Sequence, residues 1–413
     1  MVALNLNFNK IYLYLSIAFA FILPLSRAGI SLISVLIFLV WIIEGNFKNK
    51  FTNILKNNIL IVLLALISLT YLSLLWSSNV TIETFKDNDY IFLLLIPILY
   101  TSIKKEWTQN IITAFLIGIF ISEVCSYGIY FQWWIMKHGT PSDPTPFMNH
   151  IEYSVFLAFT SVLLLSRLFS KHFTKKEKLF IVPFFLTVTG NLFLTGGRTG
   201  QIALLLGIIV LFILYYKISF KSILFSIVTI ILIYFSAYII SDTFKNRVLR
   251  SINEINTIIK NHDLTTSIGI RATYYIIVKD IINENPVYML FGVGSNDSFK
   301  EIHKVLNINM KYGIYYKNFK VKEEFLRKSG THTQFLQIFL ELGIIGLFLF
   351  IYLLYLIVNS KYYSYEIKTI AILFSLIFSV SLLSDILLEL QFTRTLFILF
   401  ITLFIINIKK EDK

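Results

Sequence analysis

The chain has 413 residues, of which 56% are hydrophobic and only 15% are charged. Soluble proteins of this length do not have such a composition, and repeated apolar stretches of roughly 17–25 residues are typical of polytopic helical membrane proteins. The apolar runs are continuous, which excludes a transmembrane β-barrel, because its strands would alternate apolar and polar residues.

In chain order, the pattern predicts an all-α polytopic membrane protein with about twelve transmembrane spans. We expect nine spans within residues 1–240, a mostly polar loop domain at 241–331, and three spans with a short tail at 332–413. The large loop therefore lies between spans nine and ten. The expected spans are near residues 11–25, 30–43, 59–75, 90–102, 111–134, 151–168, 179–195, 201–216, 220–240, 333–358, 367–384 and 394–408.

The net charge of +13 comes from lysines and arginines that collect on one side of these spans. With a cytoplasmic N-terminus, the inner segments hold 18 basic residues and the short outer loops hold 5, while the other 14 of the 37 are in residues 241–331. This bias predicts cytoplasmic termini and an external large loop, because basic residues mark the cytoplasmic side of short loops. It explains the charge without a nucleic-acid partner. The single cysteine, Cys125, excludes an intramolecular disulfide.

A glycine turn, Gly196-Gly197-Arg198-Thr199-Gly200, joins spans seven and eight on the predicted outer side. Glycines give the backbone unusual freedom and expose N–H groups beside Arg198. A guanidinium in such a turn can hold a phosphate oxygen pair. The alternative is an interfacial arginine that extends toward water.

Within the loop, the apolar residues that follow Arg271 recur on one helix face. Tyr274, Ile277, Val278, Ile281 and Ile282 have helical spacing, and Asn285-Pro286 ends the pattern. We expect an amphipathic helix that lies flat on the membrane or caps the bundle. Its first turn, with Arg271, offers a second anion site; the alternative is a solvated surface charge.

His332 begins span ten, and Gln334, Gln337 and Glu341 follow on one helix face. A polar face inside an apolar helix points toward the bundle or a wet cavity, because lipid provides no hydrogen-bond partners. A histidine at the outer boundary can accept a proton from a sugar hydroxyl. A helix-capping or interfacial role is the alternative.

Other polar residues cluster at the outer ends of spans. Asn149, His150 and Glu152 begin span six and either line a sugar site or cap the helix. Asp385, Glu389 and Arg394 lie at the outer end of the last hairpin, where they can pair with each other or line the substrate site. We expect no metal and no cofactor, since neither paired carboxylates with metal-ligand spacing nor a Walker-type glycine loop is found.

Three motifs together resemble the O-antigen ligase family of bacterial membrane glycosyltransferases, which is related to O-antigen polymerases and bacterial protein O-oligosaccharyltransferases. The motifs lie in residues 150–350, in this order: Gly196 to Gly200; Gly269-Ile270-Arg271 leading to Phe291-Gly292-Val293-Gly294; and His332 to Gln337 running on to Gly346.

The resemblance implies a GT-C-like fold in the bacterial inner membrane, with the active site facing the periplasm. It implies an undecaprenyl-diphosphate-linked glycan as donor and a lipid A-core hydroxyl as acceptor, in lipopolysaccharide biosynthesis. Arg198 and Arg271 would bind the donor diphosphate, His332 would be the general base, and the transfer would be inverting and metal-independent.

Related activities use a different acceptor, either another glycan repeat unit or a protein hydroxyl. A glycan flippase is an alternative of another class. It would not need the outer domain, and its charges would follow a central pathway rather than gather at the outer face.

Overall fold

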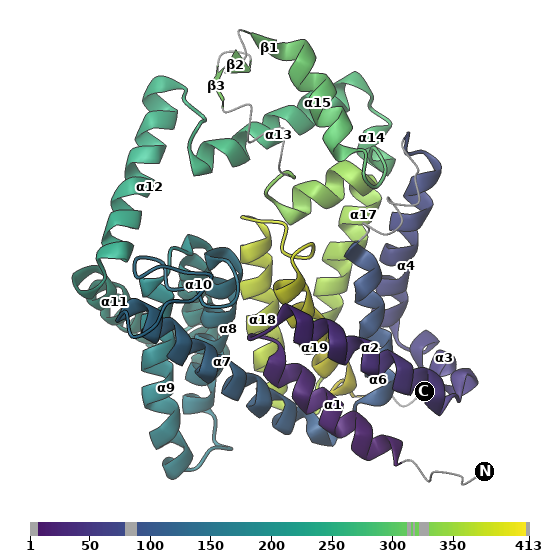
Figure 1. The fold of residues 1–413 in the computed structure, drawn as a ribbon, viewed down its shortest axis with the longest axis vertical. Coiled ribbons are helices and arrows are strands. Elements are labelled where there is room, and N and C mark those ends of the chain that lie inside the picture. The colour runs from purple at the N-terminus through teal and green to yellow at the C-terminus, as the bar shows by residue number, and fades with distance from the viewer. Residues whose placement is uncertain (1–6, 79–88, 312–314, 317–318, 322–329, 410–413) are drawn as a thin grey trace.

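The computed structural model describes residues 7–78, 89–311, 315–316, 319–321 and 330–409 (Figure 1). The other residues of the predicted 241–331 segment lie outside the described part of the chain. The helices up to the large loop are α1 Phe8–Ile22, α2 Arg27–Glu44, α3 Phe47–Leu55, α4 Asn58–Leu72, α6 Leu95–Ser102, α7 Thr108–Tyr130, α8 His150–Phe169, α9 Lys175–Leu194, α10 Arg198–Tyr216 and α11 Phe220–Ile240. Short 3-10 turns precede α6 and α7, at Asp89–Leu94 and Lys105–Trp107.

The second part of the chain contains the loop helices and the last three spans. These helices are α12 Asp242–Asn261, α13 Ser267–Glu284, α14 Tyr288–Phe291, α15 Ser298–Asn309, α17 Gln334–Asn359, α18 Tyr365–Leu382 and α19 Gln391–Ile406. Three two-residue strands, β1 Met310–Lys311, β2 Tyr315–Tyr316 and β3 Phe319–Lys320, form a small antiparallel sheet that the sequence did not predict.

The polytopic helical fold is confirmed. Within the described residues, nine helices are long and apolar enough to cross a membrane, and three shorter apolar segments lie at Phe8–Ile22, Asp89–Ser102 and Gln391–Ile406. Together they coincide with the twelve predicted spans. The chain is therefore a multi-pass membrane protein, and α3 is an additional helix between the second and third spans.

Helix α8 is the centre of the bundle and packs against α9, α10 and α18. Its Phe159 ring lies 4.6 Å from that of Phe400 and 5.0 Å from that of Phe374, measured between centroids. Close packing of this kind holds membrane helices together, since lipid is as apolar as the helix surfaces. Helix α11 lies at the edge of the bundle and exposes most of its apolar side chains.

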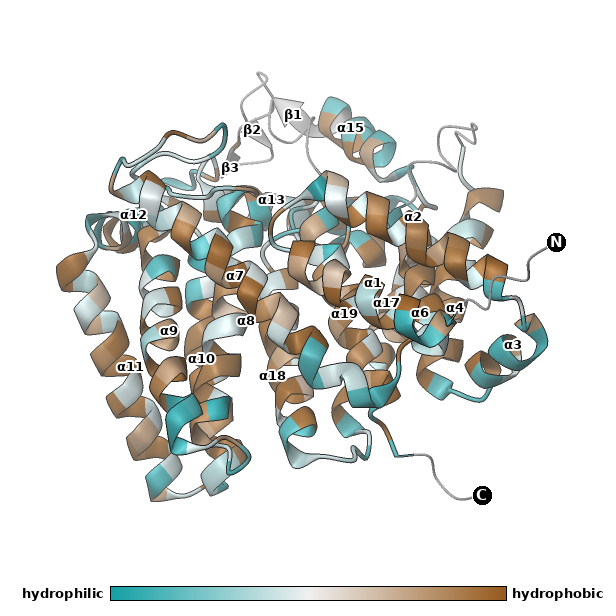
Figure 2. Cartoon of the chain, turned by 60° about the horizontal axis from the view of Figure 1, so that its bottom comes forward, coloured by the Kyte–Doolittle hydropathy of each residue, from teal (hydrophilic) through white to brown (hydrophobic). Residues whose placement is uncertain are grey.

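Residues that the sequence assigns to one side of the membrane meet at one end of the bundle. Arg27 contacts Glu152, both predicted to be outer, and Arg167 donates to Gln109 at the other end. Helices α12, α13 and α15 lie together across one end of the bundle (Figure 2), where α12 contacts Arg198 at the start of α10. The absolute orientation in the membrane stays a prediction.

The predicted amphipathic helix corresponds to α13. Its apolar stripe is buried, and Asn285 ends it as the sequence indicated. The stripe packs in a second hydrophobic core that is separate from the core of the bundle. This core contains Tyr274, Ile277, Val278 and Ile281 of α13, Ile302, Val305 and Leu306 of α15, and Leu336 and Leu340 of α17. The helix therefore caps the bundle by packing against α15 and α17.

A kink in α17 attaches the loop helices to the bundle. Gly343 has non-helical torsion angles, with φ of 64°, so the carbonyl groups before it are available to partners outside the helix. The Leu340 carbonyl accepts the backbone N–H of Val293 at 2.8 Å, and the Glu341 carbonyl accepts that of Gly294 at 3.0 Å. These bonds fix the α14 turn against the first part of α17, a helix that begins two residues after His332.

Candidate functional site

Arg198 is the first residue of α10 and points toward α12. Its guanidinium donates to Ser251 at 2.9 Å and pairs with the Glu254 carboxylate at 3.0 Å. The preceding glycine lets the start of α10 pack closely against α8, because a Cβ on Gly197 would lie 2.3 Å from the Ser154 Cβ. Arg198 is thus a fixed, partly buried cation rather than an arginine that extends freely into solvent.

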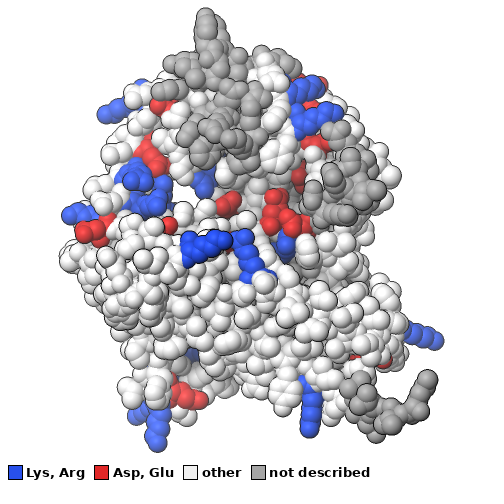
Figure 3. Space-filling model, viewed as in Figure 1, with Lys and Arg blue, Asp and Glu red and all other residues white. Residues whose placement is uncertain are grey.

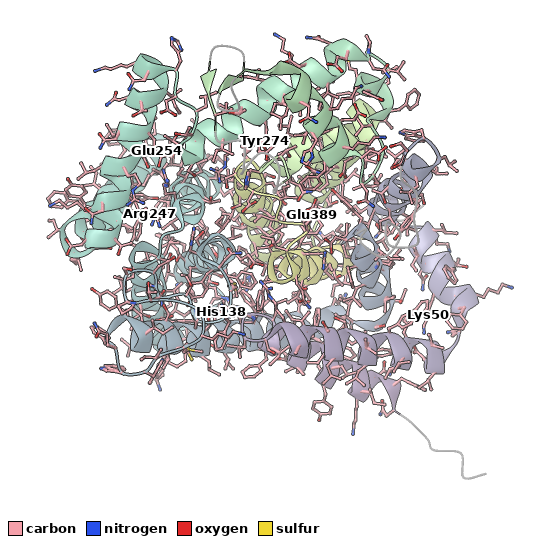
Figure 4. All side chains as sticks on the ribbon, turned by 45° about the horizontal axis from the view of Figure 1, so that its top comes forward. Lys50, His138, Arg247, Glu254, Tyr274 and Glu389 are labelled. Carbon is pink, nitrogen blue, oxygen red and sulfur yellow. The ribbon has the colours of Figure 1, made fainter. Side chains whose placement is uncertain are left out.

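Helix α12 contributes two more arginines that the sequence analysis did not single out. Arg247 lies over Gly196, where a Cβ would be 2.5 Å from its guanidinium. Burial lowers the Arg247 pKa, Arg198 and Arg250 lower it further, and Asp143 and Glu254 oppose the shift. Arg247 and Glu254 are labelled in Figure 4. Spacing i, i+3 on an amphipathic helix could have indicated Arg247 and Arg250, if α12 had been recognised.

Arg271 is in the first turns of α13. Its Nε donates to the Ser384 carbonyl at 2.8 Å, and its Nη1 donates to both the Ser267 carbonyl and hydroxyl, at 2.8 and 3.0 Å. Burial lowers the pKa of Arg271, the nearby Asp385 opposes this effect, and Arg198 adds to it. Arg198, Arg247, Arg250 and Arg271 therefore form one group of mutually repelling cations, the arginine cluster.

His332 precedes α17 by two residues, as predicted for a histidine at the start of a span. Its Nδ1 lies 3.9 Å from Oδ1 of Asp385, and its ring lies 5.8 Å from that of Tyr274. The backbone of His332 has φ of 55°, a region that L-residues rarely occupy and that often occurs at functional sites. His332 is only partly buried, so its ring remains accessible.

The polar side chains on one face of α17 form hydrogen bonds within the protein. Gln334 is fully buried, donating to the Tyr90 hydroxyl at 3.0 Å and accepting the Leu388 N–H at 2.9 Å. Gln337 donates to Ser298 at 3.1 Å and to Glu341 at 2.8 Å. The predicted inward direction is correct, but the structure does not place Gln334 or Gln337 on a surface that a substrate could reach.

The three charged residues of the last hairpin separate into different environments. Arg394 is buried, pairs with Asp89 and lies 4.3 Å from the centre of the Phe92 ring. The hypothesis that Asp385, Glu389 and Arg394 pair with each other is therefore corrected. Asp385 instead faces His332.

Glu389 is exposed on the link between α18 and α19 and is labelled in Figure 4. The surrounding protein raises the pKa of Glu389 to about 8 by withdrawing it from bulk water, with further contributions from Glu341, Asp89 and Asp385. Carboxylates thus gather beside His332, opposite in charge to the arginine cluster. Figure 3 shows basic and acidic side chains around a hollow near the middle of the visible face.

The start of α8 adjoins this region. Asn149 caps the helix, its Oδ1 accepting the Glu152 N–H at 2.9 Å, which confirms the capping role that the sequence left open. His150 lies 3.1 Å from Asp143, and Asp143 accepts the Gly196 N–H at 2.8 Å. Glu152 is buried, 3.4 Å from Arg27.

The described residues contain no cluster of three or more His, Cys, Asp or Glu side chains arranged to hold a metal ion. The expectation of a metal-independent reaction stays a prediction.

Comparison with protein families identifies the central part of the chain. Residues 183–351 match the family model described as O-Antigen ligase. This match supports membership of the O-antigen ligase family. Members of this family are glycosyltransferase-like ligases and polymerases, and they use in general a lipid-linked glycan and a lipid acceptor.

The match confirms the resemblance that the three motifs indicated. It contains Arg198, Arg271 and His332, and it extends from the middle of α9 into α17. Asn149, His150, Asp385 and Glu389 lie outside it. No curated protein matches the chain.

Proposed function

We propose that this protein is an O-antigen ligase of the bacterial inner membrane. In this proposal, the donor is a glycan on undecaprenyl diphosphate, the acceptor is a hydroxyl of lipid A-core, and the transfer takes place on the periplasmic side. Arg198 and Arg271 bind the diphosphate and His332 is the general base. The loop residues 241–331 act as the periplasmic domain of a GT-C-like transferase.

One observation carries this proposal: Ser384 and Asp385, which are adjacent in sequence, lie against Arg271 and His332 respectively. The Ser384 carbonyl accepts from Arg271 at 2.8 Å, and the neighbouring Asp385 carboxylate lies 3.9 Å from His332. A phosphate-binding group and a proton acceptor, 61 positions apart in sequence, are therefore tethered to one short link between α18 and α19. A general acid–base pair and an anion site must be close to act on one glycosyl phosphate.

The arginine cluster suits the leaving group. When the glycosyl–phosphate bond breaks, negative charge develops on the lipid diphosphate. Fixed guanidinium groups in a partly buried site stabilise this charge without reorganising, and their planar geometry matches phosphate oxygens. Arg247 adds a third guanidinium that would stabilise the same negative charge.

His332 and Asp385 suit the acceptor. The base must take the hydroxyl proton as the oxygen attacks the anomeric carbon from the face opposite the diphosphate, which inverts the configuration. The Asp385 carboxylate lies 3.9 Å from Nδ1 of His332, close enough to orient the imidazole ring. The proton therefore has a defined acceptor in the chain.

Arginine substitution tests the donor site. In purified, reconstituted protein we expect Arg271→Ala and Arg198→Ala each to lower transfer by about 10²-fold or more, because a donor to the developing anion is lost. Arg271→Lys should restore little of the activity, since an ammonium group lacks two-point geometry. Lys260→Gln, an exposed change at the end of α12, is the control. Near-normal transfer by Arg271→Ala would contradict the proposal.

The surface polysaccharide of a deletion strain tests the acceptor. Loss of a ligase leaves lipid-linked polymer that is not attached to lipid A-core. Loss of a polymerase leaves core with a single repeat unit, and loss of a protein transferase leaves lipopolysaccharide unchanged. A flippase defect would retain the lipid-linked glycan on the cytoplasmic side. We expect the first result.

A further inference from the structure

A polar cavity lies at the start of α8, next to the ion pair of Arg27 and Glu152. Its volume is about 660 Å³, a size that suits the headgroup of a phosphorylated glycolipid rather than the whole molecule. Its walls come from the link between α1 and α2, the segment that joins α7 to α8, and the start of α19. The lining residues are Leu25, Ser26, Arg27, Lys137, His138, Gly139, Thr145, Phe147, Met148, Asn149, His150 and Phe392.

The charge of this cavity favours an anion. Four of the lining residues are basic, and no Asp or Glu is among the lining residues. Arg27 is paired at 3.4 Å with Glu152, and His150 lies 3.1 Å from Asp143. Lys137 has no ion-pair partner among the described residues. A cluster of donors with one uncompensated ammonium group is suited to phosphate oxygens.

The position of the cavity favours a lipid over a free phosphate. The segment that contributes Lys137 and His138 begins with exposed aromatic and apolar residues, among them Trp133, which is 68% exposed, and Ile135, which is 99% exposed. Trp residues of this kind anchor proteins at the membrane–water boundary. The preceding helix α7 exposes Ile117 and Phe120 on its surface. The cavity therefore opens at the depth of lipid headgroups.

A series of charged side chains leads from the cavity to the candidate base. Arg27 contacts Glu152, Glu152 interacts electrostatically with Asp385, and Asp385 lies 3.9 Å from His332. The arginine cluster is a separate place, since His138 lies well below Arg247 and Glu254 in Figure 4. The cavity and the arginine cluster are thus two separate places that can bind an anion.

We propose that this cavity binds the phosphate groups of the acceptor lipid and so presents its sugar hydroxyl to His332. The inference rests on the proposed function and specifies the acceptor: a phosphorylated glycolipid in the outer leaflet, recognised through Arg27, Lys137 and His138. A protein acceptor would have no use for such a headgroup site.

Direct binding tests this inference without transfer. The full-length protein is placed in nanodiscs without donor, and its affinity is measured for lipid A with both phosphates and for lipid A from which they have been removed. We expect the phosphorylated form to bind at least ~10-fold more tightly, as two charge-assisted contacts would give. Lys137→Gln should remove much of this preference, and the double variant Arg27→Gln/Lys137→Gln should abolish it.

Further binding measurements distinguish lipid A from other phosphate-containing lipids. Lys260→Gln, which neutralises an exposed lysine of the loop domain, should bind like the wild type. Phosphatidylglycerol at equal mole fraction should compete poorly. Equal affinity for the two forms of lipid A, unchanged preference in both cavity variants, or effective competition by phosphatidylglycerol would each overturn the inference. Because no donor is present, an inactive transferase would not affect these results.

Discussion

The Arg198 guanidinium pairs with the Glu254 carboxylate at 3.0 Å, in the place where we propose that the donor diphosphate binds. Glu254 is largely buried and also faces Arg247 and Arg271 electrostatically. One carboxylate thus partly neutralises the arginine cluster. A diphosphate that binds to Arg198 must compete with Glu254, which sets the affinity for the donor and eases release of the lipid diphosphate.

Removal of this carboxylate should strengthen donor binding. We expect Glu254→Gln to lower the KM for the lipid-linked donor roughly 3- to 10-fold, about the size of one partly screened charge interaction. Initial rates at varied donor concentration measure this. Glu284→Gln, which loses an exposed pair with Lys304, is the matched control. Weaker donor binding by Glu254→Gln would show that Glu254 positions Arg198 instead of competing for it.

The α17 kink should be essential for the attachment of the loop helices. Gly343 has φ of 64°, and a Cβ there would lie 2.2 Å from the Leu290 carbonyl oxygen. Gly343→Ala should cost about 1–2 kcal/mol from the backbone alone, and more from the clash. We expect faster proteolysis within residues 241–331.

Gly45 provides the control for this experiment. Its φ of 68° is similar, but nothing lies within 4 Å of a Cβ at this position. Gly45→Ala therefore has the strain without the clash. Equal proteolysis of the two variants would argue against a structural role of the contact between Gly343 and Leu290.

The stability of the protein should depend on pH through Glu389. Its folded pKa of about 8 is higher than the ordinary 4.5, so the folded state holds this proton more tightly than the unfolded state does. The contribution to stability is complete below pH 4.5 and is lost as pH rises toward 8. Glu389→Gln should therefore raise the Tm relative to wild type more at pH 8.5 than at pH 5. A difference in Tm that does not change with pH would contradict this.

Labelling with a membrane-impermeant thiol reagent tests the orientation. In a Cys125→Ser background, a cysteine in place of Asn261 should react in spheroplasts, while one in place of Lys175 should react only after lysis. These positions are at the ends of α12 and α9. The reverse pattern would place the arginine cluster on the cytoplasmic side and exclude the proposed periplasmic reaction.

Sequence periodicity was sufficient for most elements but not for the site. The stripe from Tyr274 to Ile281 and the Asn285-Pro286 pair predicted α13, because local spacing determines an amphipathic helix. Helix α12 was missed because its isoleucines are interspersed with charged residues, and several of them remain exposed. Without α12, neither Arg247 nor the Glu254 partner of Arg198 could be identified.

Long-range partners also explain the corrections in the last spans. The inward direction of Gln334 followed from its place in an apolar helix, but its partner Tyr90 is 244 positions away. Arg394 likewise pairs with Asp89, at a separation of 305 positions. Periodicity gives the face of a helix on which a residue lies, whereas the packing of distant helices decides whether that face meets protein or substrate.

Substitution of His332 tests the central claim most directly. With purified lipid-linked donor and lipid A-core, His332→Gln should reduce kcat by about 10²–10⁴-fold, the usual contribution of a positioned base, while donor binding stays within a few-fold of wild type. Glutamine retains hydrogen bonding but cannot accept the proton. Full turnover by His332→Gln would contradict the assignment of His332 as the base.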